Sequence, residues 1–268
     1  MNNICTDVCT STKNMFYLCH SLTSVDIDHF NTENVTNMNG MFRECESLTA
    51  LDVSNFNTSK VTDMYMMFYK CLLLTELDVS GFDTSNVTQM GNVFHNCNKL
   101  KTIDVSNFNT SKVKDMTYMF YKCSSADLID VSGFDTSLVK GMKGMFWECF
   151  LLTELDVSNF DTSMVTDMHG MFRGCKKLTN IDVTRFDTSI VTDMSYMFYG
   201  CENLQNVDVS GFNVEQVSSL CEMFKNCKNL ETYGYVDEIN NWNTEHITNK
   251  TGIFDNCNKI MVKPVWYS

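Results

Sequence analysis

A phenylalanine recurs every 26 residues through most of this chain, and a cysteine follows each one after three residues. The phenylalanines are Phe16, Phe42, Phe68, Phe94, Phe120, Phe146, Phe172, Phe198 and Phe224, and the cysteines are Cys19, Cys45, Cys71, Cys97, Cys123, Cys149, Cys175, Cys201 and Cys227. A fixed period between 20 and 50 residues is typical of a solenoid, in which each unit is one supersecondary element stacked on its neighbours. The period therefore predicts a stack of coils.

One unit, residues 48–71, indicates how each coil is built. Around Leu51 and Val53, apolar and polar residues alternate, which predicts a short strand with one buried face. From Val61 to Cys71 the apolar residues recur every three or four positions, which predicts a helix of two to three turns that Thr62 caps. The predicted fold class is thus an α/β solenoid, in which each 26-residue coil has a short parallel strand and a short helix.

The register divides the chain into three parts. Residues 1–21 are expected to form a degenerate N-terminal half repeat, residues 22–229 form eight repeats, and residues 230–268 form an irregular C-terminal repeat and cap. The rhythm breaks by four residues after Cys227, so that Trp242 takes the position of Phe212. Terminal repeats of solenoids are atypical because they cover an open core. An alternative for the N-terminus is a cut inside a longer protein.

The pattern Leu-x-x-Leu-x-Val-x-x-Phe resembles the leucine-rich repeat. The complete unit looks like the 26-residue, DUF285-type repeat of mycoplasma and listeria surface lipoproteins, within the BspA-like leucine-rich repeat family. The segments that carry the resemblance include 182–184, 186–189, 191–194 and 197–198. The resemblance implies leucine-rich-repeat-like coils and a role at the cell surface in adhesion or host contact. Phenylalanines such as Phe56 stand where the usual leucine-rich repeat has Asn or Cys.

Composition restricts the possible functions. The net charge of −13 argues against a nucleic-acid partner, which needs a basic face. No apolar run approaches the length of a membrane span. The five histidines are scattered, and no phosphate loop, GxSxG or HExxH motif is present, so we expect neither an enzyme nor a cofactor. The first residues lack the basic start and apolar run of a signal peptide. Surface display or secretion therefore rests on the resemblance, and a cytoplasmic location is compatible with the sequence.

The chain has 13 cysteines, and ten of them, including Cys257, occupy one apolar position of the repeat. We interpret them as a buried ladder of reduced thiols, because free cysteine behaves as a small hydrophobic residue. Metal binding is disfavoured by the lack of CxxC pairs and neighbouring histidines. Cys5, Cys9 and Cys221 lie outside the ladder, and Cys5 could pair with Cys9. The 19 methionines mostly fall in two further core positions.

A row of aspartates is expected on the outer face of the strands. Its members are Asp26, Asp52, Asp78, Asp104, Asp130, Asp156, Asp182 and Asp208. Carboxylates about 4.8 Å apart repel one another, so something must offset their charge. Backbone N–H groups and nearby Ser or Thr hydroxyls are the favoured explanation, and bound cations such as Ca²⁺ are the alternative. Eight equivalent copies argue against a catalytic pair.

Binding residues are best sought where the repeats differ, because the repeats share what the fold needs. Large aromatics near the core phenylalanine predict a ridge on the helical side, since aromatic residues are enriched at binding hot spots. The candidate residues of the ridge are Tyr65, Tyr69, Tyr118, Tyr121, Trp147, Tyr196 and Tyr199. Leu138, Met164 and Ile190 form a second candidate, a small apolar patch. Alternatively, these side chains only cover the edges of helices and turns.

The leading functional hypothesis is a non-catalytic binding module that recognises a protein or a glycan, with no bound metal. A structural spacer or assembly-forming solenoid is the first alternative. Cation binding or ice binding is the second, and ice binding would use the single row Thr32, Thr58, Thr84, Thr110, Thr136, Thr162 and Thr188. The sequence leaves the ligand and the oligomeric state open.

Overall fold

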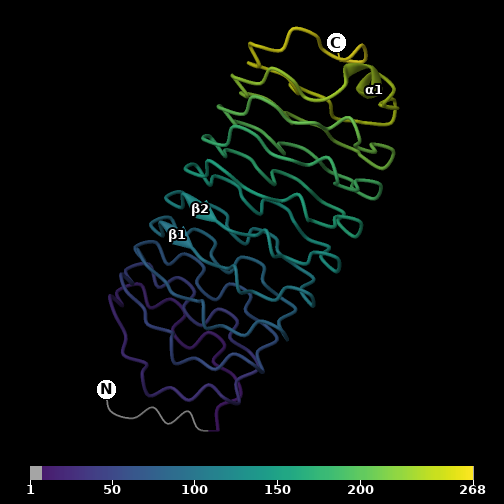
Figure 1. Cartoon of the computed structure of the whole chain (residues 1–268). Helices are drawn as coiled ribbons and strands as arrows, with labels where there is room; N and C mark the ends of the chain where they lie inside the picture. The colour runs from purple at the N-terminus through teal and green to yellow at the C-terminus, as the bar shows by residue number, and fades with distance from the viewer. Residues whose placement is uncertain (1–7, 268) are drawn as a thin grey trace.

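The computed structural model describes residues 8–267 and shows a stack of coils that runs from one end of the molecule to the other (Figure 1). The phenylalanines that recur with the repeat form a continuous column inside the stack. From Phe16 to Phe254, the rings of successive coils lie 5.2 to 5.9 Å apart and nearly parallel. Methionines, valines and leucines surround this column and are buried with it. The predicted solenoid is confirmed.

The cysteines lie beside the phenylalanine column, as predicted. The eight cysteines that recur every 26 residues from Cys45 to Cys227 are fully buried, and the 12 cysteines that the structure describes are free thiols. Each buried thiol donates to a phenylalanine carbonyl of the preceding coil; Cys97 Sγ, for example, lies 3.1 Å from the Phe68 oxygen. Burial raises the pKa of Cys97 to about 12. Cys5, and with it the question of a Cys5–Cys9 pair, lies outside the described residues.

The predicted helix from Val61 to Cys71 is wrong, because this segment is a run of tight turns. Met67 and Cys71 donate their backbone N–H groups to carbonyls three residues back, not four. Alternate N–H groups point along the stack instead; that of Phe68 donates to the Val93 oxygen of the next coil at 3.0 Å. Some backbone N–H groups of the segment therefore form hydrogen bonds to the next coil. In an α-helix the same N–H groups would bond to carbonyls four residues back in the same segment.

Two positions in each coil have a positive φ, which no right-handed helix contains. The first left-handed position is occupied by Asn14, Gly40, Met66, Asn92, Tyr118, Gly144, Gly170, Tyr196, Glu222 and Gly252. The second left-handed position is occupied by Leu18, Glu44, Lys70, Asn96, Lys122, Glu148, Gly174, Gly200, Asn226 and Asn256. Three residues before the first left-handed position Met66, the Asp63 Oδ1 atom accepts a hydrogen bond from the Tyr65 N–H at 2.9 Å. Asp63 therefore forms an Asx turn and does not lie in the first turn of a helix.

The predicted strands are present only in part. β1 (Thr102–Ile103) and β2 (Leu128–Ile129) pair in parallel, with Thr102 opposite Leu128 and Ile103 opposite Ile129. The expected alternation still holds, since Leu51 and Val53 are buried whereas Asp52 is exposed. A longer series of parallel bridges runs through the Asx-turn position instead, from Ser11 and Asn37 to Ser219 and Asn249. The short, irregular ladders leave each coil as a chain of turns around the apolar core.

The only α-helix among residues 8–267 is α1 (Val236–Asn240), which lies in the inserted segment near the C-terminus (Figure 1). After α1 in the chain, the rings of Trp242 and Trp266 stack with their centroids 6.0 Å apart, and Trp266 Nε1 donates to the Ile239 carbonyl of α1 at 2.8 Å. The ring of Tyr267 meets Phe254 edge-on at 5.2 Å. Tyr267 and Tyr233, whose ring lies 4.9 Å from that of Phe254, thus pack against the last phenylalanine of the column. Within the described residues, no helix has the length and apolarity needed to cross a membrane.

Candidate functional site

The residue directly after the core phenylalanine lies half-buried on the outside of the turns, and in eight successive coils it is an aromatic residue or an arginine. We call this set the aromatic ladder; its members are Tyr17, Arg43, Tyr69, His95, Tyr121, Trp147, Arg173 and Tyr199. In its first half, the Arg43 guanidinium lies 4.6 Å from the Tyr17 ring and 5.6 Å from Tyr69. The His95 ring is then stacked between Tyr69 and Tyr121, 4.4 Å from each.

The second half of the ladder continues without a gap. The Tyr121 and Trp147 rings are 5.5 Å apart. The Arg173 guanidinium lies 4.3 Å from the Trp147 ring and 4.5 Å from the Tyr199 ring. Each inner member therefore has a ring or a guanidinium next to it on both sides along the stack, although the Tyr121 and Trp147 rings are tilted by 50°.

The structure brings the other predicted aromatics to this ladder, with one exception. Tyr118 meets Tyr121 edge-on at 5.4 Å, and Tyr196 lies 5.8 Å from Tyr199. Tyr65 is in a different position of the repeat and takes part in no ring contact among the described residues. Sequence reasoning did not select His95 and Arg173 as site residues, although they occupy the same position as Tyr121. The shared position was the signal that could have identified them.

Glycines of the following coil make room for these rings. A Cβ atom on Gly144 would overlap the Tyr118 ring, and one on Gly170 would lie 2.6 Å from Cε3 of Trp147. A Cβ on Gly91 would come within 3.2 Å of the Tyr65 ring. Both Gly144 and Gly170 also have a positive φ, which favours glycine. A bulky ring in one coil is thus matched by a missing side chain in the next.

The predicted apolar patch is exposed but does not take part in the ladder. Leu138, Met164 and Ile190 have exposed fractions of 43%, 36% and 42%. In an earlier coil the same position carries Lys112, whose Nζ donates to Asn86 Oδ1 at 2.7 Å. The patch therefore replaces a row of polar contacts between coils by three apolar side chains.

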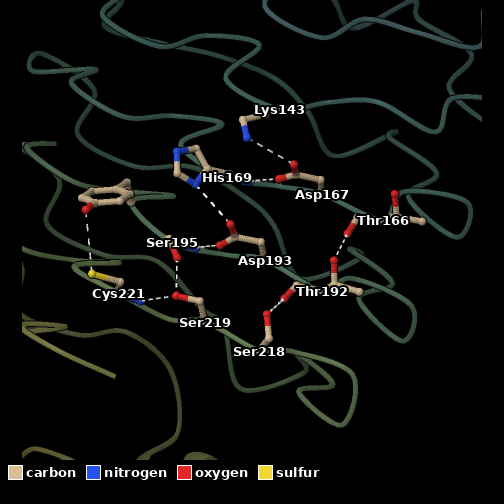
Figure 2. Close-up of polar contacts among 11 residues, drawn as sticks. Lys143, Thr166, Asp167, His169, Thr192, Asp193, Ser195, Ser218, Ser219 and Cys221 are labelled. Atoms are coloured by element: carbon tan, nitrogen blue, oxygen red, sulfur yellow. Dashed lines mark hydrogen bonds and ion pairs between the residues drawn. The ribbon is translucent and has the colours of Figure 1, made fainter. Parts of the chain in front are cut away.

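Figure 2 shows a row of polar contacts between coils in the C-terminal half of the stack. Lys143 Nζ lies 3.5 Å from Asp167 Oδ2, and His169 Nδ1 lies 3.3 Å from Asp193 Oδ2. In the next coils, Ser195 Oγ and Ser219 Oγ are 2.6 Å apart. Two contacts join this row to the ladder side. His169 lies 5.8 Å from the Trp147 ring, and Cys221 Sγ lies 3.8 Å from the Tyr196 hydroxyl.

Asp193 in the polar row and His95 in the ladder have strongly shifted pKa values. Burial raises the pKa of Asp193, but hydrogen bonds from His169 and Ser195 outweigh it and bring the pKa down to about 2. Burial, reinforced by Lys70 and Lys122, lowers the pKa of His95 to about 4. His95 is therefore neutral at pH 7, and its buried Nδ1 has no hydrogen-bond partner among the described residues.

A hollow of about 420 Å³ opens beside the C-terminal part of the ladder. Its lining residues are Glu148, Phe150, Arg173, Gly174, Lys176, Tyr199, Gly200, Glu202, Asn226 and Lys228. A larger depression of about 600 Å³ lies on the strand side, between Asn180 and Tyr235. The smaller hollow is the more informative one, because ladder residues form one of its walls.

Most of the aspartate row accepts hydrogen bonds from nearby hydroxyls and backbone N–H groups, as predicted. Asp130 Oδ1 accepts the Ser132 N–H at 3.0 Å and the Ser132 hydroxyl at 2.7 Å. The same pair of contacts recurs at Asp78, Asp104, Asp156, Asp182 and Asp208. Among residues 8–267, no group of three His, Cys, Asp or Glu side chains is arranged to hold a metal ion. Hydroxyls and N–H groups thus serve as the partners of these aspartates.

The threonine row is also internal. Its members are 1% to 2% exposed, and Thr58 Oγ1, for example, donates to the Asp83 carbonyl of the next coil at 3.0 Å. Because these hydroxyls are buried and engaged, the hypothesis that this row binds ice is wrong. The threonines instead help to hold successive coils together.

The sequence matches a family described as "Mycoplasma protein of unknown function, DUF285" over residues 2–76, 73–154 and 149–265. These segments cover nearly the whole chain. The chain belongs to this family. The DUF285 assignment confirms the family that the 26-residue unit predicted. No curated protein sequence matches the chain.

Several solved bacterial structures are similar to this DUF285 chain at low sequence identity. A leucine-rich repeat protein from Bacteroides ovatus is 14% identical, with a TM-score of 0.44 and coverage of 92% of this chain and 68% of that one. A leucine-rich repeat protein from Eubacterium ventriosum is 18% identical, with a TM-score of 0.41 and coverage of 97% and 83%. The functional domain of InlJ from Listeria monocytogenes, which includes a cysteine ladder, is 18% identical, with a TM-score of 0.28 and coverage of 91% and 48%. Because these TM-scores are below 0.5, the similarities establish neither a shared fold nor a shared function.

Proposed function

We propose that this chain is a non-catalytic module that binds a protein partner along the aromatic ladder, at the surface of a bacterial cell. The observation that supports it best is the unbroken, half-buried series from Tyr17 to Tyr199. Tyr, Trp and Arg are the residues most enriched at protein hot spots. The surface location rests on the resemblance to BspA-like proteins.

The geometry of the ladder favours a protein over a glycan. A sugar that packs on an aromatic residue needs a free ring face. In the ladder, the faces of His95 are covered by Tyr69 and Tyr121 at 4.4 Å, and Trp147 lies between Tyr121 and Arg173. A partner therefore meets ring edges, hydroxyls and a guanidinium. Such mixed apolar and hydrogen-bonding groups suit the core of a protein interface.

Parallel binding screens of the folded chain against extracellular-matrix and host-surface proteins, and against a glycan array, test this proposal. We expect a protein ligand whose affinity falls at least about tenfold for Tyr121→Ala or Trp147→Ala, which corresponds to about 1.4 kcal/mol. Leu128→Ala is the control, because Leu128 is 53% exposed in β2, outside the ladder. Circular dichroism checks that each variant is folded.

Three results contradict the proposal. The first is a screen in which the folded chain binds no protein. The second is binding of glycans alone. The third is a protein ligand whose affinity is the same for Trp147→Ala and for the unchanged chain, because the interface would then lie elsewhere.

A further inference from the structure

Arg173 is held flat in the ladder and has no partner for its charge. Its guanidinium lies between the rings of Trp147 and Tyr199, at 4.3 and 4.5 Å, and 4.9 Å from Tyr196. Stacking on both faces leaves the N–H donors in the plane of the group free to point outward. In the part of the chain that the structure describes, no acceptor forms a hydrogen bond or an ion pair with this guanidinium.

Arg43 occupies the same ladder position and shows the contrast. Its guanidinium also stacks on two tyrosines, but its Nε donates to Glu44 Oε1 at 3.2 Å. Glu44 is at the second left-handed position of its coil, directly after the arginine. Arg173 is followed at that position by Gly174, which has no side chain. The coil of Arg173 therefore lacks the carboxylate that neutralises Arg43.

The hollow beside Arg173 has an excess of positive charge. Its lining includes three cationic side chains (Arg173, Lys176 and Lys228) and two carboxylates (Glu148 and Glu202). Glu202 binds both lysines, with Nζ to Oε distances of 3.2 Å to Lys176 and 2.7 Å to Lys228. Glu148 Oε2 lies 3.7 Å from Lys122 Nζ, and its Oε1 accepts a hydrogen bond from Trp147 Nε1 at 3.2 Å. Among the charged groups that line the hollow, Arg173 alone has no opposite charge bound to it.

Two successive coils, those of Gly174 and Gly200, have glycine at the second left-handed position, and both glycines line the hollow. A Cβ atom placed on Gly200 would have its nearest neighbour 3.9 Å away, at the Cα of Gly174. Of the ten coils that carry this position, only these two have glycine there, and the others have Leu, Glu, Lys or Asn. Two of the residues that line the hollow beside Arg173 therefore have no side chain.

We propose that this hollow receives the carboxylate of an Asp or Glu side chain of the protein partner, with Arg173 as its bidentate ligand. A planar guanidinium matches a carboxylate through two parallel N–H···O hydrogen bonds. The stacked rings already fix the guanidinium, so little side-chain entropy is lost on binding. The inference rests on the proposed function, because it assigns the partner's contact at one end of the aromatic ladder. The net charge of −13 repels strongly acidic surfaces at long range. The hollow therefore favours a single carboxylate of the partner over an acidic patch.

The side-chain Nε–Hε signals of arginine in an NMR spectrum of the full chain test this assignment directly. The chain has three arginines, so Arg43 and the exposed Arg185 serve as internal controls for Arg173. The probes are glutamate capped at both ends by acetyl and amide groups, the equally capped glutamine, and inorganic phosphate. We expect capped glutamate to shift the Arg173 signal saturably, while the signals of the two other arginines stay in place and capped glutamine has no effect.

Two variants separate a bidentate site from a simple positive charge. Arg173→Lys keeps the charge but not the fork; in a titration followed by backbone amide signals around the hollow, we expect at least a tenfold loss of affinity for capped glutamate. Gly174→Glu supplies an internal carboxylate in the relation that Glu44 has to Arg43, and we expect it to abolish the glutamate-dependent shift of Arg173. Unchanged affinity in Arg173→Lys overturns the proposal. So do tighter binding of inorganic phosphate than of capped glutamate, and an equal response of Arg43.

The probes do not involve the partner, so this inference and the proposed function can fail separately. If capped glutamate binds at Arg173 but no protein ligand depends on Trp147 or Tyr121, the carboxylate site is supported and the proposed ladder interface is contradicted. If a protein ligand depends on those residues but binds equally well to Arg173→Gln, the interface stands and the carboxylate contact is overturned.

Discussion

Replacing Gly170 by alanine tests whether the ladder depends on glycines beneath its rings. The new Cβ would lie 2.6 and 2.7 Å from Cε3 and Cζ3 of Trp147, so the indole must move. Gly170 also has φ = +62°, where an alanine costs about 1–2 kcal/mol relative to its usual conformation. Displacing a packed ring adds about 1–3 kcal/mol, as in other overpacked sites. We therefore expect a loss of stability of about 2–5 kcal/mol.

Gly200→Ala is the matched control. Gly200 has φ = +69°, but its Cβ would meet nothing closer than 3.9 Å. Only the backbone cost of about 1–2 kcal/mol applies to this variant. The difference between the two variants in urea unfolding isolates the contact with Trp147, and near-ultraviolet circular dichroism reports the displaced indole.

A double-mutant cycle completes this test. In a Trp147→Ala background the new methyl group at position 170 no longer meets a ring, so the cost of Gly170→Ala should fall to that of Gly200→Ala. Equal losses for Gly170→Ala and Gly200→Ala in the unchanged chain would refute the reasoning. An undiminished loss in the Trp147→Ala background would refute it too.

Further expectations concern the core, the aspartate row and one histidine. Unfolding without reductant should release at least 12 titratable free thiols, because the 12 described cysteines are unpaired. Phe120→Ala should cost about 3–5 kcal/mol in urea unfolding, and Phe16→Ala less, because Phe120 is fully buried and Phe16 only half-buried. Asp130→Asn should leave the melting temperature nearly unchanged, with or without chelator, since an amide oxygen can accept the same hydrogen bonds from Ser132. Below pH 6.5 the unfolded chain protonates His95 while the folded chain does not. Thermal unfolding should therefore show a stability loss of about 2–3 kcal/mol between about pH 6.5 and 4, which His95→Phe removes.

Contrary results would be specific. Mostly oxidised cysteines would contradict the thiol ladder, and equal costs at Phe120 and Phe16 would mean that the first coil is as well covered as a central one. A Ca²⁺-dependent rise in melting temperature that Asp130→Asn abolishes would establish a cation site on the aspartate row. A pH dependence identical in His95→Phe would place the responsible group elsewhere.

The sequence predicts the stack and its interior because both depend on periodicity. Any residue that must face the axis recurs at 26 residues, so the positions of Phe120, Cys123 and their equivalents are visible without knowledge of the backbone. The same holds for the outward Asp130, whose partner Ser132 follows two residues later in an Asx turn. These features are local or strictly repeated, and pattern reasoning suffices for them.

The backbone between these positions could not be predicted in the same way. Apolar residues at Val61, Met64, Met67 and Cys71 fit the spacing of a helix, but two consecutive tight turns give nearly the same spacing. Hydrogen bonds to the next coil decide between them, and such bonds depend on stacking that no single repeat reveals. The available signal was the frequent Gly and Asn at the two left-handed positions, which oppose a helix.

The ladder was predicted as a ridge of separate aromatics, and its continuity depends on contacts between coils. Tyr118, which packs against the ladder residues Tyr121 of its own coil and His95 of the preceding coil, shows how such contacts depend on the neighbouring coil. As a tyrosine with φ = +54° it costs about 1–2 kcal/mol, at a position where Gly144 and Gly170 fit without strain. Its edge-on contact with Tyr121 stabilises the folded state by about 0.5–1.5 kcal/mol. The partial burial of the ring and its edge-on contact with His95 at 6.1 Å add to this, so these contacts offset the backbone cost. Tyr196, with φ = +61° and a ring 4.9 Å from Arg173, presents the same balance. Other coils have Asn14, Met66, Asn92 and Glu222 at this position with a similar φ. The ring contacts of Tyr118 and Tyr196, and not the backbone strain, therefore connect this position to the ladder.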